Sequence, residues 1–311
     1  MRLRPPEKLC LAIVAAIAVI DACLIATGRL TIDMTGYAFT VGVGLMMVAV
    51  GQFYRTVRKD ERLALAATAS GAFVLFTNVA SILNYLLLPV KFPLIDAALA
   101  AADAALGLHW PDLIALAAEH PLISRVLSVV YFTSLPQIMA VILILCTVRD
   151  DRALHRFLVT GLVGVLIALC FWIFFPSFGT SVYFNVPQEL VQRAQLAVTP
   201  AYGAELTRLG KEGAGFLTPK DALGLIAFPS VRMLLACLSV WFMARSRVFF
   251  VPAAALNLLM VPAILIHGGH HLVDVLGGVA TFVFAYVLSG KALQWLASAE
   301  AGCMPIEDAT R

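Results

Sequence analysis

We expect from this sequence an all-α fold, a polytopic membrane helix bundle with about eight transmembrane helices. Of its 311 residues, 61% are hydrophobic and only 13% are charged. The mean hydropathy of +0.92 lies far above the range of soluble globular domains. Several apolar stretches also approach the roughly 20 residues that a helix needs to cross a hydrocarbon core about 30 Å thick. The composition therefore predicts an integral membrane protein and excludes a soluble one.

The apolar stretches define the predicted helices in chain order. Each contains few charged side chains, and polar segments separate one from the next. They cover residues 9–28, 37–54, 63–89, 122–148, 157–175, 229–244, 248–268 and 275–297. No internal repeat or low-complexity linker interrupts them, so we expect one membrane domain.

Lysine and arginine alternate between connecting segments, which predicts the orientation. Short loops that stay in the cytoplasm carry an excess of these residues. The basic groups lie before the first stretch and after the second, fourth and sixth; they are Arg2, Arg4, Lys8, Arg55, Arg58, Lys59, Arg62, Arg149, Arg152, Arg156, Arg245 and Arg247. Both termini are therefore expected in the cytoplasm, with residues 90–121 and 176–228 outside an inner or plasma membrane. A cleaved signal peptide is the alternative at the N-terminus, and the lack of a small-residue cleavage site disfavours it.

The two long outward segments differ in composition. In the first, apolar residues recur at helical spacing with Asp96 and Asp103 among them, which predicts short amphipathic helices. The second is rich in proline and glycine and carries Arg208 and Lys220. A polar, cationic loop of this length is expected to have a functional role.

Cysteine content and net charge limit the possible partners. The outward segments contain none of the six cysteines, so no disulfide framework and no cysteine-based metal site is predicted. The net charge of +3 reflects the basic inner loops and does not indicate nucleic-acid binding. We expect membrane lipids as partners, no nucleic acid and no cofactor, and the sequence predicts no particular oligomeric state.

The stretch "LIHGGHHLVDVLGG", residues 265–278, contains three of the six histidines and an aspartate. Such groups at membrane depth are costly and usually mark function. His270 and Asp274 are four residues apart, so on a helix the carboxylate can accept a ring N–H and fix the tautomer of the imidazole. A structural His–Asp contact is one alternative. A metal site made by His267, His270, His271 and Asp274 is the other.

A second unusual stretch is "AFPSVRMLLACL", residues 227–238. A Phe-Pro-Ser turn precedes an apolar run, and Arg232 places a permanent charge inside that run. Helix-terminal N–H groups after such a turn can bind an anion.

Together the two stretches resemble the type 2 phosphatidic acid phosphatase superfamily. Gly-His-His-x-x-Asp-Val-x-x-Gly at 269–278 and Phe-Pro-Ser about 40 residues upstream carry the resemblance. More narrowly, the chain is similar to the inositol phosphorylceramide synthase-like branch, over roughly residues 90–297, including "VVYFTSLPQ" and "FWIFFPSFG". The resemblance implies a six-helix phosphatase-like core within 90–297. Residues 1–89 would be N-terminal helices, the first two accessory, and 298–311 a cytoplasmic tail.

The resemblance also implies roles for individual residues. His270 would attack phosphorus and become a phosphohistidine, and Asp274 would orient it. Ser230 would bind phosphate oxygens, and basic side chains of the preceding loop would add charge compensation, with Arg208 the best match and Lys220 a further candidate. Splitting phosphoryl transfer into two steps through an enzyme nucleophile is chemically reasonable.

Arg232 departs from the family pattern. It stands where the family has a histidine that protonates the leaving oxygen, and a guanidinium cannot donate and recover a proton near neutrality. Three interpretations are open: Arg232 binds phosphate while His271 or His267 supplies the proton; the leaving group needs little protonation, as in a diphosphate; or catalysis is lost and a phosphate-binding pocket remains. A fourth is that Arg232 extends to the membrane interface.

We therefore expect an enzyme, a membrane lipid phosphatase or phosphotransferase that acts on a lipid-linked phosphate or diphosphate at the outer face. A catalytically impaired phospholipid-binding or scaffold protein is the alternative. A transporter is disfavoured because charged residues are scarce in the middle of the apolar stretches. Tyr131 and Gln137 are expected to pack around a proline kink or to line a lipid entrance.

Overall fold

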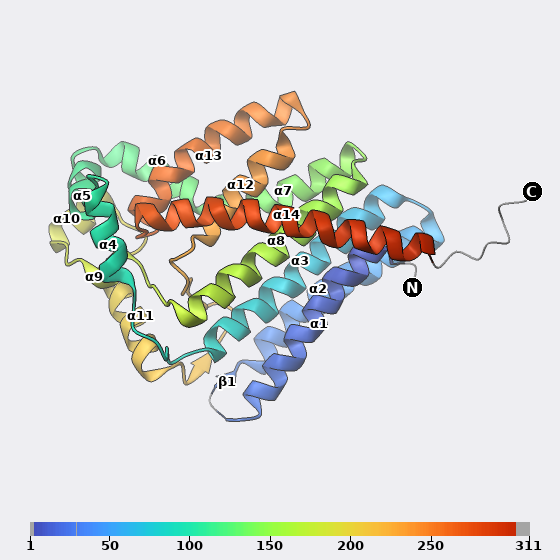
Figure 1. Cartoon of the computed structure of the whole chain (residues 1–311), viewed down its shortest axis with the longest axis horizontal. Helices are drawn as coiled ribbons and strands as arrows, with labels where there is room; N and C mark the ends of the chain where they lie inside the picture. Colours follow the sequence, from blue (N-terminus) through green and yellow to red (C-terminus); the bar gives the residue numbers. More distant parts are fainter. Residues whose placement is uncertain (1–2, 29, 303–311) are drawn as a thin grey trace, which may run out of the picture.

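The computed structural model describes residues 3–28 and 30–302 and confirms the all-α fold (Figure 1). Within these ranges a two-stranded parallel sheet, β1 (Thr31–Ile32) and β2 (Phe216–Leu217), accompanies the helices. The helices are α1 (Pro5–Ile25), α2 (Met34–Phe53), the π-helical turn η1 (Tyr54–Arg58), α3 (Glu61–Leu86), α4 (Asp96–Ala105), α5 (Trp110–Glu119), α6 (Pro121–Phe132), α7 (Ser134–Thr147), α8 (Asp151–Phe174), α9 (Thr180–Tyr183), α10 (Gln188–Ala194), α11 (Pro200–Glu212), α12 (Val231–Met243), α13 (Arg247–His267) and α14 (Leu272–Gly302). Residues 303–311 of the expected tail lie outside the described residues.

All eight apolar stretches contain helices, but two of them are divided or short. In the described part of the chain, six helices are long and apolar enough to span a membrane, or seven if α5 and α6, bent by 115°, form one span. The stretch 122–148 is divided into α6 and α7, and 229–244 contains only the 13-residue α12. At 1.5 Å per residue such a helix is about 20 Å long, too short to cross a core of about 30 Å. These apolar helices indicate an integral membrane protein.

The helices are arranged so that one end of the bundle holds the short elements. In Figure 1, α4, α5, α9, α10 and α11 gather at one end, and the beginning of α1 and the end of α14 lie at the other. The helices α1 and α2 pack mainly against α3, while α12 packs against α7, α8, α13 and α14. The short α12 is therefore central, and its start is held among the other helices.

The first outward segment forms the short helices that its periodicity predicted. They are α4 and α5, and the face of α4 that packs inward carries Asp96 and Asp103, both almost fully buried. Carboxylates are rarely buried without partners. Their partners belong to the candidate site.

Candidate active site

His270 and Asp274 form a pair at the beginning of α14. The Nδ1 atom of His270 lies 3.1 Å from Oδ2 of Asp274, whose side chain is fully buried. The same Oδ2 accepts a hydrogen bond of 2.8 Å from the backbone N–H of His271. An ionised carboxylate can only accept, so Nδ1 of His270 donates and Nε2 keeps its lone pair. The pair can therefore present Nε2 as a nucleophile or a base.

The Phe-Pro-Ser turn is joined to this pair through the backbone. The N–H of Ser230 donates to the carbonyl oxygen of Asp274 at 3.0 Å. A Cβ atom at Gly278 would collide with the carbonyl oxygen of Ser230, so the absence of a side chain lets α14 pass close to the turn. The hydroxyl of Ser230 caps α12 by accepting from the N–H of Met233 at 3.3 Å. The starts of α12 and α14 are thus held together.

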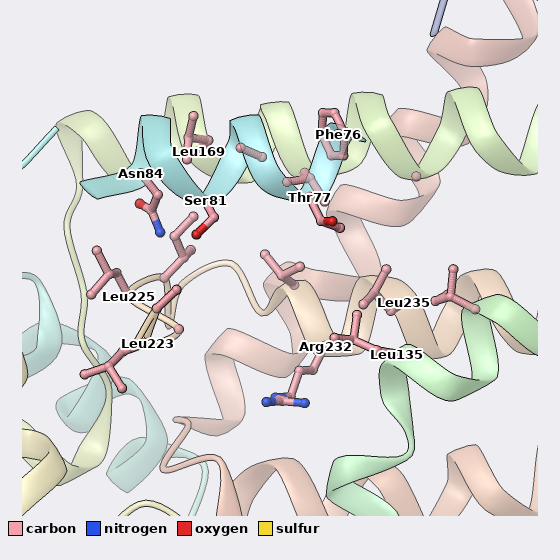
Figure 2. Close-up of a pocket in the computed structure, with 18 of the residues that line it drawn as sticks. Phe76, Thr77, Ser81, Asn84, Leu135, Leu169, Leu223, Leu225, Arg232 and Leu235 are labelled. Atoms are coloured by element: carbon pink, nitrogen blue, oxygen red, sulfur yellow. The ribbon is translucent and has the colours of Figure 1, made fainter. Parts of the chain in front are cut away.

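Arg232, the second residue of α12, lines a large cavity that His270 also lines. The cavity has a volume of about 390 Å³ and is bounded mainly by α3, α7, α8, α12 and residues 222–227. Figure 2 shows the Arg232 side chain extending from α12, with the polar residues of α3 on the opposite side. The sequence-based interpretation in which Arg232 extends to the membrane interface is therefore not supported.

Tyr131 holds the Arg232 guanidinium in place. The guanidinium carbon of Arg232 lies 3.8 Å from the centroid of the Tyr131 ring, and Nη1 of Arg232 donates to the Tyr131 carbonyl oxygen at 3.2 Å. A second, longer contact of 3.5 Å joins Nη1 to the hydroxyl of Ser134. Among residues 3–28 and 30–302, no carboxylate forms an ion pair with Arg232. A partly buried cation without a counter-charge is suited to binding an anion.

Most of the cavity wall is apolar. Side chains such as Phe76, Leu135, Leu169 and Leu235 line it (Figure 2). An apolar chamber with a few polar groups is the usual composition of a small-molecule site. The geometry suits a molecule that combines a hydrocarbon chain with an anionic group.

The structure does not bring Arg208 or Lys220 to this cavity. Arg208 is exposed on α11 and pairs with Glu205 at 2.6 Å and Glu212 at 3.5 Å. These contacts, above all the hydrogen bond to Glu205, raise the pKa of Arg208. Arg208 lines a separate hollow with residues of β2, and Lys220 is exposed after β2. Two nearby carboxylates already compensate the charge of Arg208.

His267 and His271 are also placed away from the cavity wall. His267 is fully buried, and its Nε2 lies 2.7 Å from the backbone oxygen of Ser124, to which it donates. His271 is fully buried between Asp96 and Asp103, with nitrogen-to-oxygen distances of 3.9 Å and 3.5 Å. Neither imidazole is positioned to protonate a leaving group beside His270. In the part of the chain that the structure describes, no three potential ligands gather as a metal site requires.

Asp96 and Asp103 are site-organising residues that sequence reasoning missed. Asp96 accepts hydrogen bonds from the hydroxyl of Ser177 at 2.8 Å and the N–H of Gly179 at 2.7 Å. Asp103 accepts from the first N–H groups of α14, those of Leu272 at 2.8 Å and residue 273 at 3.1 Å. Burial raises the pKa of Asp96, although its hydrogen bonds oppose that shift. The only sequence signal is that the two aspartates are seven residues apart and so share a helix face.

Comparison with known proteins adds a family match that covers these elements. A family model described as the PAP2 superfamily matches residues 97–288, well over half of the chain. That range contains Ser230, Arg232, His270 and Asp274. Neither the curated proteins nor the solved structures yield a match.

Proposed function

The chain belongs to the PAP2 superfamily, and from this membership we propose that it is a membrane enzyme that removes or transfers the phosphate of a lipid-linked phosphate or diphosphate. The observation that supports this most directly is the shared cavity. His270 and Arg232 both line this one mostly apolar chamber, and Arg232 has no carboxylate partner in the described chain. A hydrocarbon chain and a phosphate can occupy such a chamber together.

The reaction proceeds in two steps. In the first, the lone pair of His270 Nε2 attacks phosphorus, a P–N bond forms, and the bond from phosphorus to the leaving oxygen breaks. Asp274 stabilises the positive charge that develops on the imidazole through its contact with Nδ1. In the second, the oxygen of water or of an alcohol attacks phosphorus, the P–N bond breaks, and the proton of the attacking O–H passes to the released Nε2 and from there to solvent. Water gives a phosphatase, and an alcohol gives a phosphotransferase.

Arg232 compensates the charge of the transferring phosphoryl group. Phosphoryl transfer depends on positioning and on neutralising the three equatorial oxygens. The guanidinium is held by Tyr131 and by no carboxylate of the described chain, so its charge is available. Ser230, expected from the sequence to bind phosphate, is fully buried and does not line the cavity, and its hydroxyl caps α12 instead.

The replacement of the family's acid histidine by Arg232 favours a leaving group that needs no proton. The structure does not support the interpretation in which His267 or His271 supplies one, since both are engaged away from the cavity wall. A diphosphate, whose leaving phosphate departs as an anion, fits this site. The same replacement also supports the second candidate, a protein that binds lipid phosphates without turning them over.

The resemblance to the inositol phosphorylceramide synthase-like branch favours an alcohol as acceptor. The site is proposed to face outward, because the basic inner loops predict that the end carrying α4, α5 and α11 lies outside.

The test is phosphate release or transfer from a panel of lipid monophosphates and diphosphates by the purified chain. His270→Ala should lower turnover by about 10³-fold or more, because the nucleophile is removed. Arg208→Ala is the matched control, since this arginine lies on the same end of the bundle and is already paired. Full activity in His270→Ala would refute the phosphohistidine mechanism.

Arg232→His distinguishes the two candidates. If the natural chain lacks only its acid, the histidine should raise turnover of monophosphates, by up to about 10²-fold to 10⁴-fold. If the arginine itself stabilises the transition state for diphosphates, their turnover should fall. Binding of every lipid phosphate with no turnover in either form would establish the binding protein instead.

A further inference from the structure

The polar side chains of α3 form a second wall of the cavity, opposite Arg232. Thr77, Ser81 and Asn84 follow one another at intervals of four and three residues, so they lie on one helix face. All three line the cavity, and Figure 2 shows them pointing from α3 into it. This helix lies outside residues 97–288, so the family match does not account for the wall.

Nearby hydroxyl groups are already used by the protein. The hydroxyl of Tyr85 accepts from the N–H of Leu223 at 2.7 Å, and that of Tyr202 donates to the carbonyl oxygen of Gly224 at 3.0 Å. These two contacts hold the segment that precedes α12 against the cavity. The tyrosines therefore have a structural explanation, and on α3 the hydroxyl of Thr77 likewise donates to the carbonyl oxygen of Val74 at 2.8 Å.

Asn84 differs from these tyrosines because its side-chain oxygen has no partner. The Oδ1 atom is buried and accepts no hydrogen bond within the described chain. An atom that is fully buried cannot be reached from the cavity, so the group of this amide that a bound molecule can contact is Nδ2. Figure 2 shows this nitrogen directed into the cavity, and it donates no hydrogen bond within the described chain.

We propose that Thr77, Ser81 and Asn84 bind a hydroxyl-bearing part of the substrate while Arg232 and His270 bind its phosphate. The inference rests on the proposed function and extends it to the substrate class, a lipid phosphate for which a hydroxyl group is bound at the α3 wall. The Nδ2 group of Asn84 donates to the oxygen of that hydroxyl. The hydroxyl belongs either to the lipid itself, next to its phosphate, or to a separate alcohol acceptor.

The same helix supplies a matched control in Asn78. Its Oδ1 accepts from the hydroxyl of Thr40 on α2 at 2.6 Å, and its Nδ2 donates to the carbonyl oxygen of Val74 at 2.8 Å. Asn78 does not line the cavity. Asn84→Leu and Asn78→Leu therefore make the same chemical change on two different faces of α3.

The first experiment measures equilibrium binding and needs no turnover. The probes are 1-O-alkylglycerol 3-phosphate, with its free 2-hydroxyl, and its 2-deoxy analogue. Where the lipid supplies the hydroxyl, the natural chain should bind the hydroxylated probe about 10-fold more tightly, and Asn84→Leu should abolish that preference. Asn78→Leu should keep it. Unchanged affinity of Asn84→Leu for the 2-deoxy probe shows that the variant remains folded.

The second experiment separates an acceptor alcohol from the lipid's own hydroxyl. The 2-deoxy lipid phosphate is supplied with glycerol, and the phosphate released to water is compared with that transferred to glycerol. If the acceptor occupies the α3 wall, Asn84→Leu should lower the transferred share about 10-fold and leave hydrolysis intact. The proposal is overturned if Asn84→Leu changes neither the binding preference nor the transferred share. Because the binding experiment needs no turnover, a failure of the proposed catalysis does not affect its result.

Discussion

The guanidinium of Arg232 lies against the ring of Tyr131 in a chain segment that is otherwise apolar. Its position is explained by local contacts, because the ring face and the Tyr131 carbonyl oxygen both attract a cation. A lysine at this position would keep the charge and lose the planar contact with the ring.

Replacement of Arg232 should therefore weaken phosphate binding in a graded manner. Arg232→Met should lower the affinity for an alkyl phosphate by about 10-fold to 100-fold, the effect of losing a hydrogen bond to a charged group. Arg232→Lys should lie between this variant and the natural chain. Equilibrium binding measures both, and equal affinities for all three proteins would exclude Arg232 from the phosphate site.

Asp96 should make stability depend on pH. Burial raises its pKa in the folded protein above the ordinary value of about 3.9, so the folded state binds this proton more tightly than the unfolded chain does. Its contribution to stability is therefore present at low pH and is lost as the pH rises through the raised pKa. As the pH rises through this range, the melting temperature of Asp96→Asn should fall less steeply than that of the natural chain.

The control for this pH dependence is Asp112→Asn, because the side chain of Asp112 is 81% exposed. It should leave the dependence unchanged. His271 is the ionisable side chain that faces Asp96, with Nε2 3.9 Å from Oδ1 of Asp96. An identical slope in Asp96→Asn and the natural chain would contradict the assignment.

At the scale of elements, α14 depends on a helix far from it in sequence. Its first N–H groups donate to Asp103 on α4, and its Asp274 joins the start of α12 through the backbone. An unsatisfied helix N-terminus is unfavourable, and a carboxylate there also interacts well with the helix dipole. The His270–Asp274 pair is therefore positioned by a helix of residues 90–121, a segment that contains neither proposed catalytic residue.

Removal of this contact should destabilise the site before it affects the chemistry. Asp103→Ala should lower the free energy of unfolding by about 1–2 kcal/mol, the usual cost of losing a capping side chain. Thermal unfolding in detergent measures the change, with Asp112→Ala as a nearly neutral control. If Asp103→Ala and Asp112→Ala have the same melting temperature, Asp103 does not stabilise α14.

At the scale of the whole molecule, the distribution of basic residues predicts opposite exposure for the two ends of the bundle. Lys220 lies at the end with the short helices, whereas Arg58 follows α2 at the other, and both are exposed. A membrane-impermeant maleimide should label Lys220→Cys in intact cells and should label Arg58→Cys only after lysis. The unsubstituted chain gives the background, and the reverse pattern would invert the proposed orientation.

The sequence determined the features that depend on composition and on residues close together in the chain. Hydropathy predicted the all-α membrane bundle, and the spacing of His270 and Asp274 predicted their contact, because four residues separate the two side chains. The sequence also identified Arg232 as the residue that departs from the family pattern. Local spacing is sufficient for these inferences, since the partners are near in sequence or belong to a short motif.

Only the tertiary structure decided which distant residues share the cavity. It separated Arg208 from Arg232, although both are arginines on the expected outward side, because the charge of Arg208 is satisfied by carboxylates on its own helix. It also brought Asp103 to α14 and turned Asn84 toward the cavity. These placements result from packing between helices that are far apart in the chain, and the periodicity of one helix does not specify which neighbour its polar face will meet.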